Sequence, residues 1–115
     1  MQASTRPIQT TDAEILATLH SVSWRSAYRG ILRDTYLDMD VVDERRAVWR
    51  ERLGDLTPSH FGFIAEIGTE PVGFVFLHGH DDPTWGTLID NLHVLPDLKG
   101  KGVGRLLMAA AAQEA

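Results

Sequence analysis

Hydrophobic residues at helical spacing predict a first helix near the start of the chain, after a short strand over residues 6–9. The buried stripe of this helix comprises Ile15, Leu16, Leu19 and Val22. Thr11 and Glu14 fit a capping box at its start, in which the threonine caps the helix and the glutamate reaches back. Residues 23–32 then close the helix and turn at Gly30.

An aromatic pair, Trp24 and Tyr28, lies in this closing segment. The two residues are at positions i and i+4, so a helix places them on one face. Aromatic residues at helical spacing usually pack a helix onto its neighbours, which is the plain interpretation of the pair.

A second helix is predicted over residues 40–53, and Gly54 supplies its stop. Val42, Trp49 and Leu53 lie on its apolar side. The charged residues between Glu44 and Arg52 fit a solvated face with internal ion pairs better than a binding site for an acidic partner.

Three strands follow, predicted over residues 61–67, 72–77 and 86–95. The first alternates with a period of two, through Phe61, Phe63, Ala65 and Ile67. Gly68-Thr69-Glu70-Pro71 separates the first two strands, which favours an antiparallel hairpin, and Asp81-Asp82-Pro83 makes the next turn. The three strands therefore form a meander.

A basic glycine-rich turn follows the third strand. Pro96 ends the strand because proline cannot donate to a sheet ladder, and a further helix then shows the periodic apolar residues Val103, Leu106, Leu107 and Ala110. The glycines therefore stand at a helix N-terminus, where unpaired N–H groups and the macrodipole favour an anion, most often phosphate. Lys99, Lys101 and Arg105 add positive charge.

The spacing of this turn excludes two familiar phosphate motifs. A P-loop needs GxxxxGK followed by Ser or Thr, and a dinucleotide fingerprint counted from Gly100 would need glycine where Arg105 stands. The remaining pattern, Lys99-x-x-Gly102-x-Gly104 after a strand, resembles the signature of the GNAT superfamily of acyl-CoA-dependent N-acetyltransferases. In that signature Lys99 replaces the usual Arg or Gln, which keeps a donor but loses a planar fork.

This resemblance implies an α+β, GNAT-like fold in a single domain over residues 1–115, ordered strand, two helices, three-strand meander, glycine-rich turn and helix. The family's later strands and helix are absent from the sequence, so the resemblance implies a truncated domain. It also implies acetyl-CoA as cosubstrate. The expected contacts of acetyl-CoA are Leu92, His93 and Val94 for the pantetheine arm, and Lys99, Gly100, Lys101, Gly102, Val103, Gly104 and Arg105 for the pyrophosphate.

The resemblance further implies direct attack of an amine on the thioester, with the backbone N–H of Val94 holding the oxyanion. Asp90, His93 or an ordered water would take the amine's proton. Strand alternation places Asp90 with Leu92, and Asn91 with His93 on the other face. His93 equally fits a structural role, and both interpretations stay open.

Two further roles depend on the resemblance. Trp24 and Tyr28 would line the acceptor pocket, as the second interpretation of this pair. The tyrosine that often protonates the leaving thiolate comes from the part of the fold that this sequence lacks, so neither Tyr28 nor Tyr36 inherits that role.

Composition narrows the classes of function and location that remain for this chain. A net charge of -5 over 115 residues argues against non-specific nucleic-acid binding. The chain has no cysteine and no apolar run of membrane-helix length, so we expect a cytoplasmic protein without disulfides and without a membrane partner. Residues 78–82 crowd His and Asp together, but a loop explains them and no metal is expected.

Two functions are consistent with these patterns. The first is an N-acetyltransferase acting on a primary amine of a small molecule or peptide. The second is a non-catalytic, truncated module that binds CoA or a protein partner. An uncovered sheet edge after residue 115 would expose unpaired backbone groups, so a homodimer or another partner covering that edge is expected.

Overall fold

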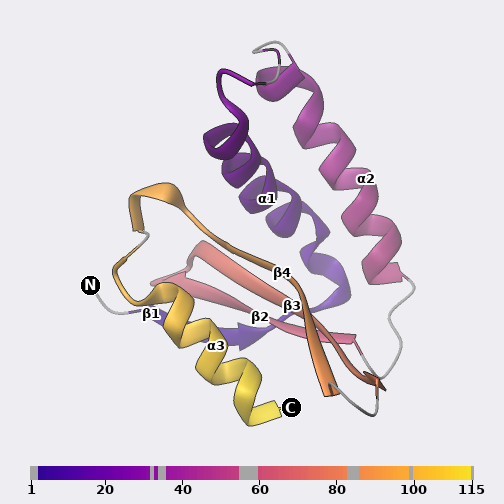
Figure 1. The fold of residues 1–115 in the computed structure, drawn as a ribbon, viewed down its shortest axis with the longest axis vertical. Coiled ribbons are helices and arrows are strands. Elements are labelled where there is room, and N and C mark those ends of the chain that lie inside the picture. The colour runs from indigo at the N-terminus through magenta and orange to yellow at the C-terminus, as the bar shows by residue number, and fades with distance from the viewer. Residues whose placement is uncertain are drawn as a thin grey trace.

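The computed structural model describes residues 3–31, 33, 36–54, 60–82, 86–98 and 100–114, without the side chains of residues 38, 78–82, 86–90 and 114. These residues form an antiparallel sheet in the order β1-β2-β3-β4, with α1 and α2 on one face and α3 on the other (Figure 1). The elements are β1 (Ala3–Pro7), a 3-10 turn (Thr10–Asp12), α1 (Ala13–Tyr28), a π-helical turn (Tyr36–Asp40), α2 (Val41–Gly54), β2 (His60–Ile67), β3 (Glu70–Asp82), β4 (Gly86–Val94), a second 3-10 turn (Pro96–Leu98) and α3 (Val103–Glu114). The predicted α+β fold and its element order are confirmed.

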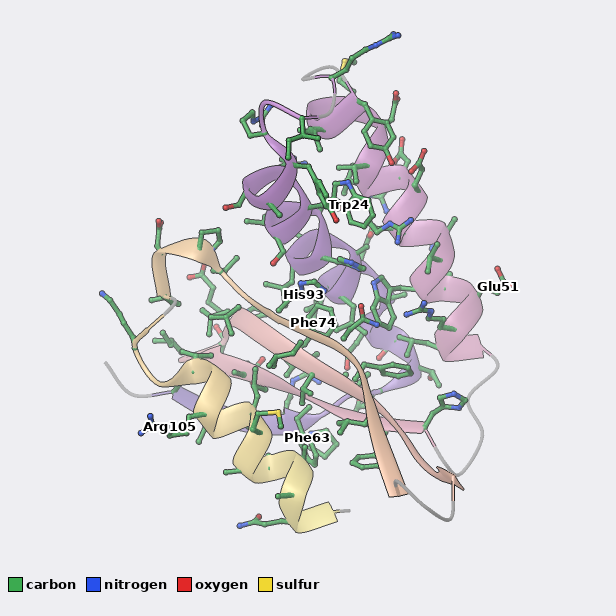
Figure 2. All side chains as sticks on the ribbon, viewed as in Figure 1. Trp24, Glu51, Phe63, Phe74, His93 and Arg105 are labelled. Carbon is green, nitrogen blue, oxygen red and sulfur yellow. The ribbon has the colours of Figure 1, made fainter. Side chains whose placement is uncertain are left out.

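Both faces of the sheet are buried. Ile64, Phe74 and Phe76 pack on one face with Trp49 and with the α1 residues Ala13, Leu16, Ala17 and Leu19, whereas Val22 of the predicted stripe is not part of this cluster. On the other face, α3 covers a second cluster made of Phe63, Ala65, Val72, Val75, Leu77, Val103, Leu107 and Ala111. Figure 2 shows Phe74 directed toward α1 and α2, and Phe63 directed toward α3. Successive residues of a central strand are therefore apolar, as a sheet covered on two sides requires.

The entry into α1 differs from the predicted capping box. The N-cap residue of α1 is Asp12, not Thr11. The Asp12 carboxylate accepts the Gln9 N–H at 2.7 Å and two guanidinium bonds from Arg6 at 2.9 and 3.0 Å. The Asp12 side chain therefore joins the start of α1 to β1 and to the preceding turn, and it makes no cap hydrogen bond within α1 itself.

Three other boundaries or faces were predicted wrongly. β1 begins at Ala3, although pairing with β2 does extend past Pro7 because the Ile8 N–H donates to Gly62 O at 2.9 Å. Val41, and not Val42, is fully buried on α2, because Val41 shares the i+8 and i+12 positions with Trp49 and Leu53. Residues 78–82 continue β3 as backbone strand where a loop was predicted.

Candidate active site

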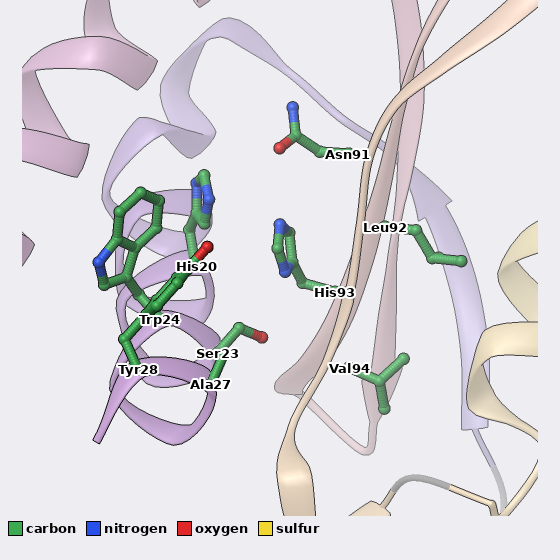
Figure 3. Close-up of a pocket in the computed structure, with 9 residues that line it drawn as sticks. All are labelled: His20, Ser23, Trp24, Ala27, Tyr28, Asn91, Leu92, His93 and Val94. Atoms are coloured by element: carbon green, nitrogen blue, oxygen red, sulfur yellow. The ribbon is translucent and has the colours of Figure 1, made fainter. Parts of the chain in front are cut away.

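A cavity of about 400 Å³ lies between the C-terminal half of α1 and the end of β4. It is lined by His20, Ser23, Trp24, Ala27, Tyr28, Asn91, Leu92, His93 and Val94 (Figure 3). The five α1 residues are spaced i, i+3, i+4, i+7 and i+8, which places them on one helix face. The predicted acceptor-pocket residues Trp24 and Tyr28 and the predicted strand residues 92–94 therefore meet at one cavity.

The β4 side chains divide between the two faces of the sheet. Figure 3 shows Asn91 and His93 directed toward α1, and Leu92 directed the opposite way. The pairing register shifts upstream of them, because Phe76 faces Asn91 while Leu77 faces Ile89. Asp90 is therefore the extra residue of a β-bulge, and alternation cannot be carried through it. Its side chain lies outside the described structure, so its role as a base stays a prediction.

Successive residues of β4 direct their backbone N–H and C=O groups alternately toward β3 and away from it. The Leu95 N–H donates to Val72 O at 2.9 Å, so the neighbouring pair of Val94 with Gly73 is a non-hydrogen-bonded pair of the antiparallel ladder. Val94 and Leu92 consequently direct their N–H and C=O groups away from β3. Within the described sheet β4 is an outer strand, so these groups face its open edge. The backbone of His93, by contrast, is directed toward β3.

Two histidine rings lie close together in the lining of the cavity. The ring centroids of His20 and His93 are 4.4 Å apart, with 33° between the ring planes. The Trp49 indole N–H donates to His20 Nδ1 at 3.1 Å. Burial, together with the positive charges of His93, Arg45 and Arg52, lowers the pKa of His20 to about 4. His20 is therefore neutral at pH 7, with its proton on Nε2.

Sequence reasoning missed His20. The buried stripe of the first helix was assigned from apolar residues alone, yet His20 is 7% exposed and belongs to the same face. The available signal was its position four residues after Leu16 and four before Trp24. A polar residue in that register is either a hydrogen-bonded core residue or part of a site.

Trp24 and Tyr28 form the outer wall of the cavity. Their ring centroids are 5.0 Å apart, and the Arg45 guanidinium lies 5.0 Å from the Trp24 ring centroid. Trp24 is half-buried, whereas Tyr28 is 39% exposed. The pair therefore lines the cavity and does not only pack α1 onto the sheet.

The glycine-rich turn has the geometry of an anion site. Gly100 and Gly102 have φ angles of +83° and +90°, which only glycine adopts readily, and a Cβ at either position would meet no atom within 4 Å. Backbone conformation therefore requires these glycines, and the space beside them is open. The Leu106 N–H donates to Gly102 O at 3.0 Å, which makes Gly102 the N-cap of α3.

Four N–H groups at this helix start have no intrahelical acceptor, those of Gly102, Val103, Gly104 and Arg105. The Lys101 N–H does not belong to this set, because it donates to Leu98 O at 3.2 Å. The side chains of Lys101 and Arg105 are exposed, and Lys99 lies outside the described residues. The described turn can thus offer four backbone donors and two cationic side chains to a phosphate group.

No group of three His, Cys, Asp or Glu side chains among the described residues is placed to hold a metal ion; the side chains of residues 78–82 are not among those described. No helix in the described ranges is both long and apolar enough to span a membrane.

Comparisons with known proteins agree on one family. The sequence profile of the acetyltransferase (GNAT) family matches residues 21–115. The PaiA N-acetyltransferase of Thermoplasma acidophilum, solved in complex with coenzyme A, is similar in fold, with a TM-score of 0.75 and 18% identity over 99% of this chain and 72% of that chain. A GCN5-related N-acetyltransferase of Ralstonia eutropha has a TM-score of 0.68 and 26% identity over 98% of this chain and 75% of its own.

A third structure, apo YjaB of Escherichia coli, has a TM-score of 0.64 and 27% identity over 100% of this chain and 67% of its own. No match was found among curated proteins. The profile match covers most of the chain, including the second half of α1, the strands β2 to β4 and the glycine-rich turn. The chain therefore belongs to the GNAT family of acetyltransferases, which transfer an acetyl group from acetyl-CoA to an amine.

Proposed function

We propose that this chain transfers the acetyl group of acetyl-CoA to a primary amine of a small molecule or peptide, in the cavity between α1 and β4. One observation carries the proposal. The backbone donors at the open edge of β4 adjoin a cavity that contains an imidazole, and the same strand leads directly into the anion-binding start of α3. A site for the donor's phosphates and a site for chemistry are thus joined by one strand.

The donor would bind along two backbone surfaces. The pyrophosphate would lie on the N–H groups of residues 102–105, with the Lys101 and Arg105 side chains balancing its charge. The pantetheine amides would pair with Leu92 and Val94, because these two residues direct their backbone groups to the open edge. His93 would contribute its side chain and not its backbone, which refines its predicted cofactor contact.

The chemistry needs a proton acceptor and an oxyanion donor. His93 would take the proton of the incoming ammonium, after which the amine nitrogen attacks the thioester carbonyl. The Val94 N–H would donate to the developing oxyanion as a C–N bond forms. The C–S bond then breaks, and the remaining excess proton of the nitrogen passes to the departing sulfur, which leaves as the thiol. No described lining residue of the cavity is a carboxylate, which favours His93 as the base.

The acceptor would lie against the aromatic wall. Trp24 and Tyr28 offer flat apolar surface at the cavity mouth, suited to the carbon skeleton that carries the amine. Arg45 behind Trp24 makes this wall electropositive, so a neutral amine is better accommodated there than an ammonium. Removal of the amine's proton would therefore accompany binding.

The second candidate function is a module that binds CoA or a partner protein without turnover. The observation that favours it is apolar exposure on β4 and α3, where Leu92 is 41% exposed and Met108 is 37% exposed. A homodimer or another partner would then cover β4.

Two measurements test and separate these functions. Acetyl-CoA at about 100 times its dissociation constant should stabilise the chain by about 2.7 kcal/mol, seen as a thermal shift. Thiol release should then be followed with a diamine, an aminoglycoside and a peptide with a free N-terminus. A thermal shift with release for any of these supports the enzyme, a shift without release supports the module, and no shift contradicts both.

A further inference from the structure

His20 is the buried residue of the cavity that the proposed reaction leaves without a role. A neutral imidazole has one N–H and one lone pair, and the lone pair of His20 Nδ1 already accepts the Trp49 indole N–H at 3.1 Å. Trp49 is 0% exposed, so a proton on Nδ1 would displace this bond and leave a buried indole N–H unpaired. His20 is therefore anchored, and it cannot serve as the base.

The anchored ring forms a surface for His93. His20 and His93 approach to 4.4 Å between centroids, and Phe74 lies 5.3 Å from His93 and 6.3 Å from His20. Figure 3 shows the two imidazoles facing each other, one from α1 and one from β4. The His93 side chain is thus bounded by one ring of the helix and one ring of the sheet.

The charged groups around His20 act in the same direction. His93 faces it from β4, and Arg45 and Arg52 act on it from α2, so each positive charge disfavours a proton on His20. A second positive charge beside a protonated His93 is consequently unfavourable. His20 stays neutral while His93 takes up and releases a proton.

We propose that His20 is a positioning residue: anchored by Trp49, its ring holds the His93 imidazole in the orientation that faces the amine. The inference rests on the proposed acetyl transfer with His93 as base. It predicts that catalysis depends on the ring at position 20 and that stability depends on the acceptor that Trp49 uses. These two dependences can be separated by substitution.

Two matched variants make this separation. In His20→Asn the amide oxygen can replace Nδ1 as the acceptor for Trp49, but the ring beside His93 is lost. In His20→Phe the ring remains and the acceptor is lost. We expect His20→Asn to lower kcat about tenfold while KM for acetyl-CoA stays within about twofold. We expect His20→Phe to retain kcat within about threefold and to have the lower Tm of the two.

A residue with only a structural role gives the opposite pattern, in which kcat follows Tm and His20→Phe is the slower variant. The double variant His20→Asn/His93→Ala should be no slower than His93→Ala, since positioning has no effect without the base. Wild-type kcat in His20→Asn, or additive losses in the double variant, would overturn the proposal.

Failure of the proposed function is recognised separately. If the wild-type chain releases no thiol with any amine, or if His93→Ala leaves release unchanged, the base assignment fails. Nuclear magnetic resonance of the His93 ring then decides the positioning claim. Side-chain averaging of His93 should increase in His20→Asn and not in His20→Phe, and equal averaging in both would contradict it.

Discussion

His20 and Asp12 show, at the scale of single residues, that burial determines the energetic effect of a polar group. His20 is neutral because its environment penalises a proton. Burial alone would raise the pKa of Asp12, but the hydrogen bonds from Arg6 and the Gln9 backbone outweigh it and lower that pKa. Glu14 forms a closer pair with Arg46, at 2.5 Å against 2.9 Å for Arg6 with Asp12, yet on the surface. The distance between the charged atoms alone therefore does not decide how much each pair contributes to stability.

The low pKa of His20 predicts a pH-dependent stability. The unfolded chain protonates this histidine below its ordinary pKa of 6.5, whereas the folded chain does so only near pH 4. The free energy of unfolding should therefore fall as the pH drops from 6.5 to 4, by about 3 kcal/mol from this residue. Urea unfolding at several pH values should show this slope in the wild type and a smaller slope in His20→Asn. Equal slopes would exclude His20 as the cause.

The Arg6–Asp12 pair should matter more than the Arg46–Glu14 pair. Asp12→Asn removes a charge that accepts three hydrogen bonds in a site where the Asp12 side chain is 7% exposed, so we expect a loss of about 2 kcal/mol. The matched control is Glu14→Gln, whose side chain is 57% exposed, and it should leave chemical unfolding unchanged. Equal effects of the two substitutions would contradict this ranking.

His93 and Asp90 can be distinguished by activity. His93→Ala should lower kcat about a hundredfold or more if the imidazole takes the amine's proton. Asp90→Asn should change kcat much less, since the carboxylate is assigned no step. Steady-state kinetics of thiol release tests both substitutions. A larger loss of kcat in Asp90→Asn than in His93→Ala would assign the role of base to Asp90.

At the scale of elements, β4 and the start of α3 form one continuous unit. The bulge at Asp90 shifts the pairing register between β4 and β3. Leu92 and Val94 then direct their N–H and C=O groups to the open edge of β4, and Gly102 is the N-cap of α3. Gly102 is needed for its positive φ, whereas Gly104 is not in the left-handed region. A Cβ at Gly104 would lie 3.9 Å from Val94 Cγ2, an ordinary contact. The two glycines therefore have different reasons to be present.

Substitutions of Gly104 test the anion site without disturbing the turn. Gly104→Glu should fold but lose the acetyl-CoA thermal shift, because it places a negative side chain beside the N–H groups that have no intrahelical acceptor at the start of α3. Gly104→Ala is the control and should keep the shift while gaining up to about 1 kcal/mol of stability from helix propensity. A normal shift in Gly104→Glu would contradict the assigned phosphate site.

At the scale of the whole molecule, the charge at the start of α3 is opposite in sign to the net charge of the chain. The chain has a net charge of -5, yet Lys101 is exposed in the turn before α3 and Arg105 is exposed in the first turn of α3. The rest of the acidic molecule repels a phosphate-bearing ligand, while this turn attracts it. The sheet brings the turn and the cavity to the same strand, so donor binding and chemistry share β4.

Salt should therefore weaken donor binding. Exposed cations are screened within a Debye length of about 10 Å at 0.1 M salt, and more strongly above it. Calorimetric titration with acetyl-CoA should show Kd rising from low to high salt, with a smaller rise in Lys101→Ala. Salt-independent affinity would indicate that backbone donors alone hold the phosphates.

The sequence by itself determined the order of elements, the glycine-rich turn and the family resemblance, because hydrophobic periodicity and turn residues act over a few neighbouring positions. It also placed Asn91 and His93 on one face of a strand. Tertiary structure decided which α1 face meets β4, since His20 and His93 are 73 positions apart and only packing joins them. It likewise selected Asp12 as the cap and the edge-directed backbone of Val94, because both depend on partners in other elements. Local patterns cannot encode such contacts, which arise only when the sheet and helices enclose a common core.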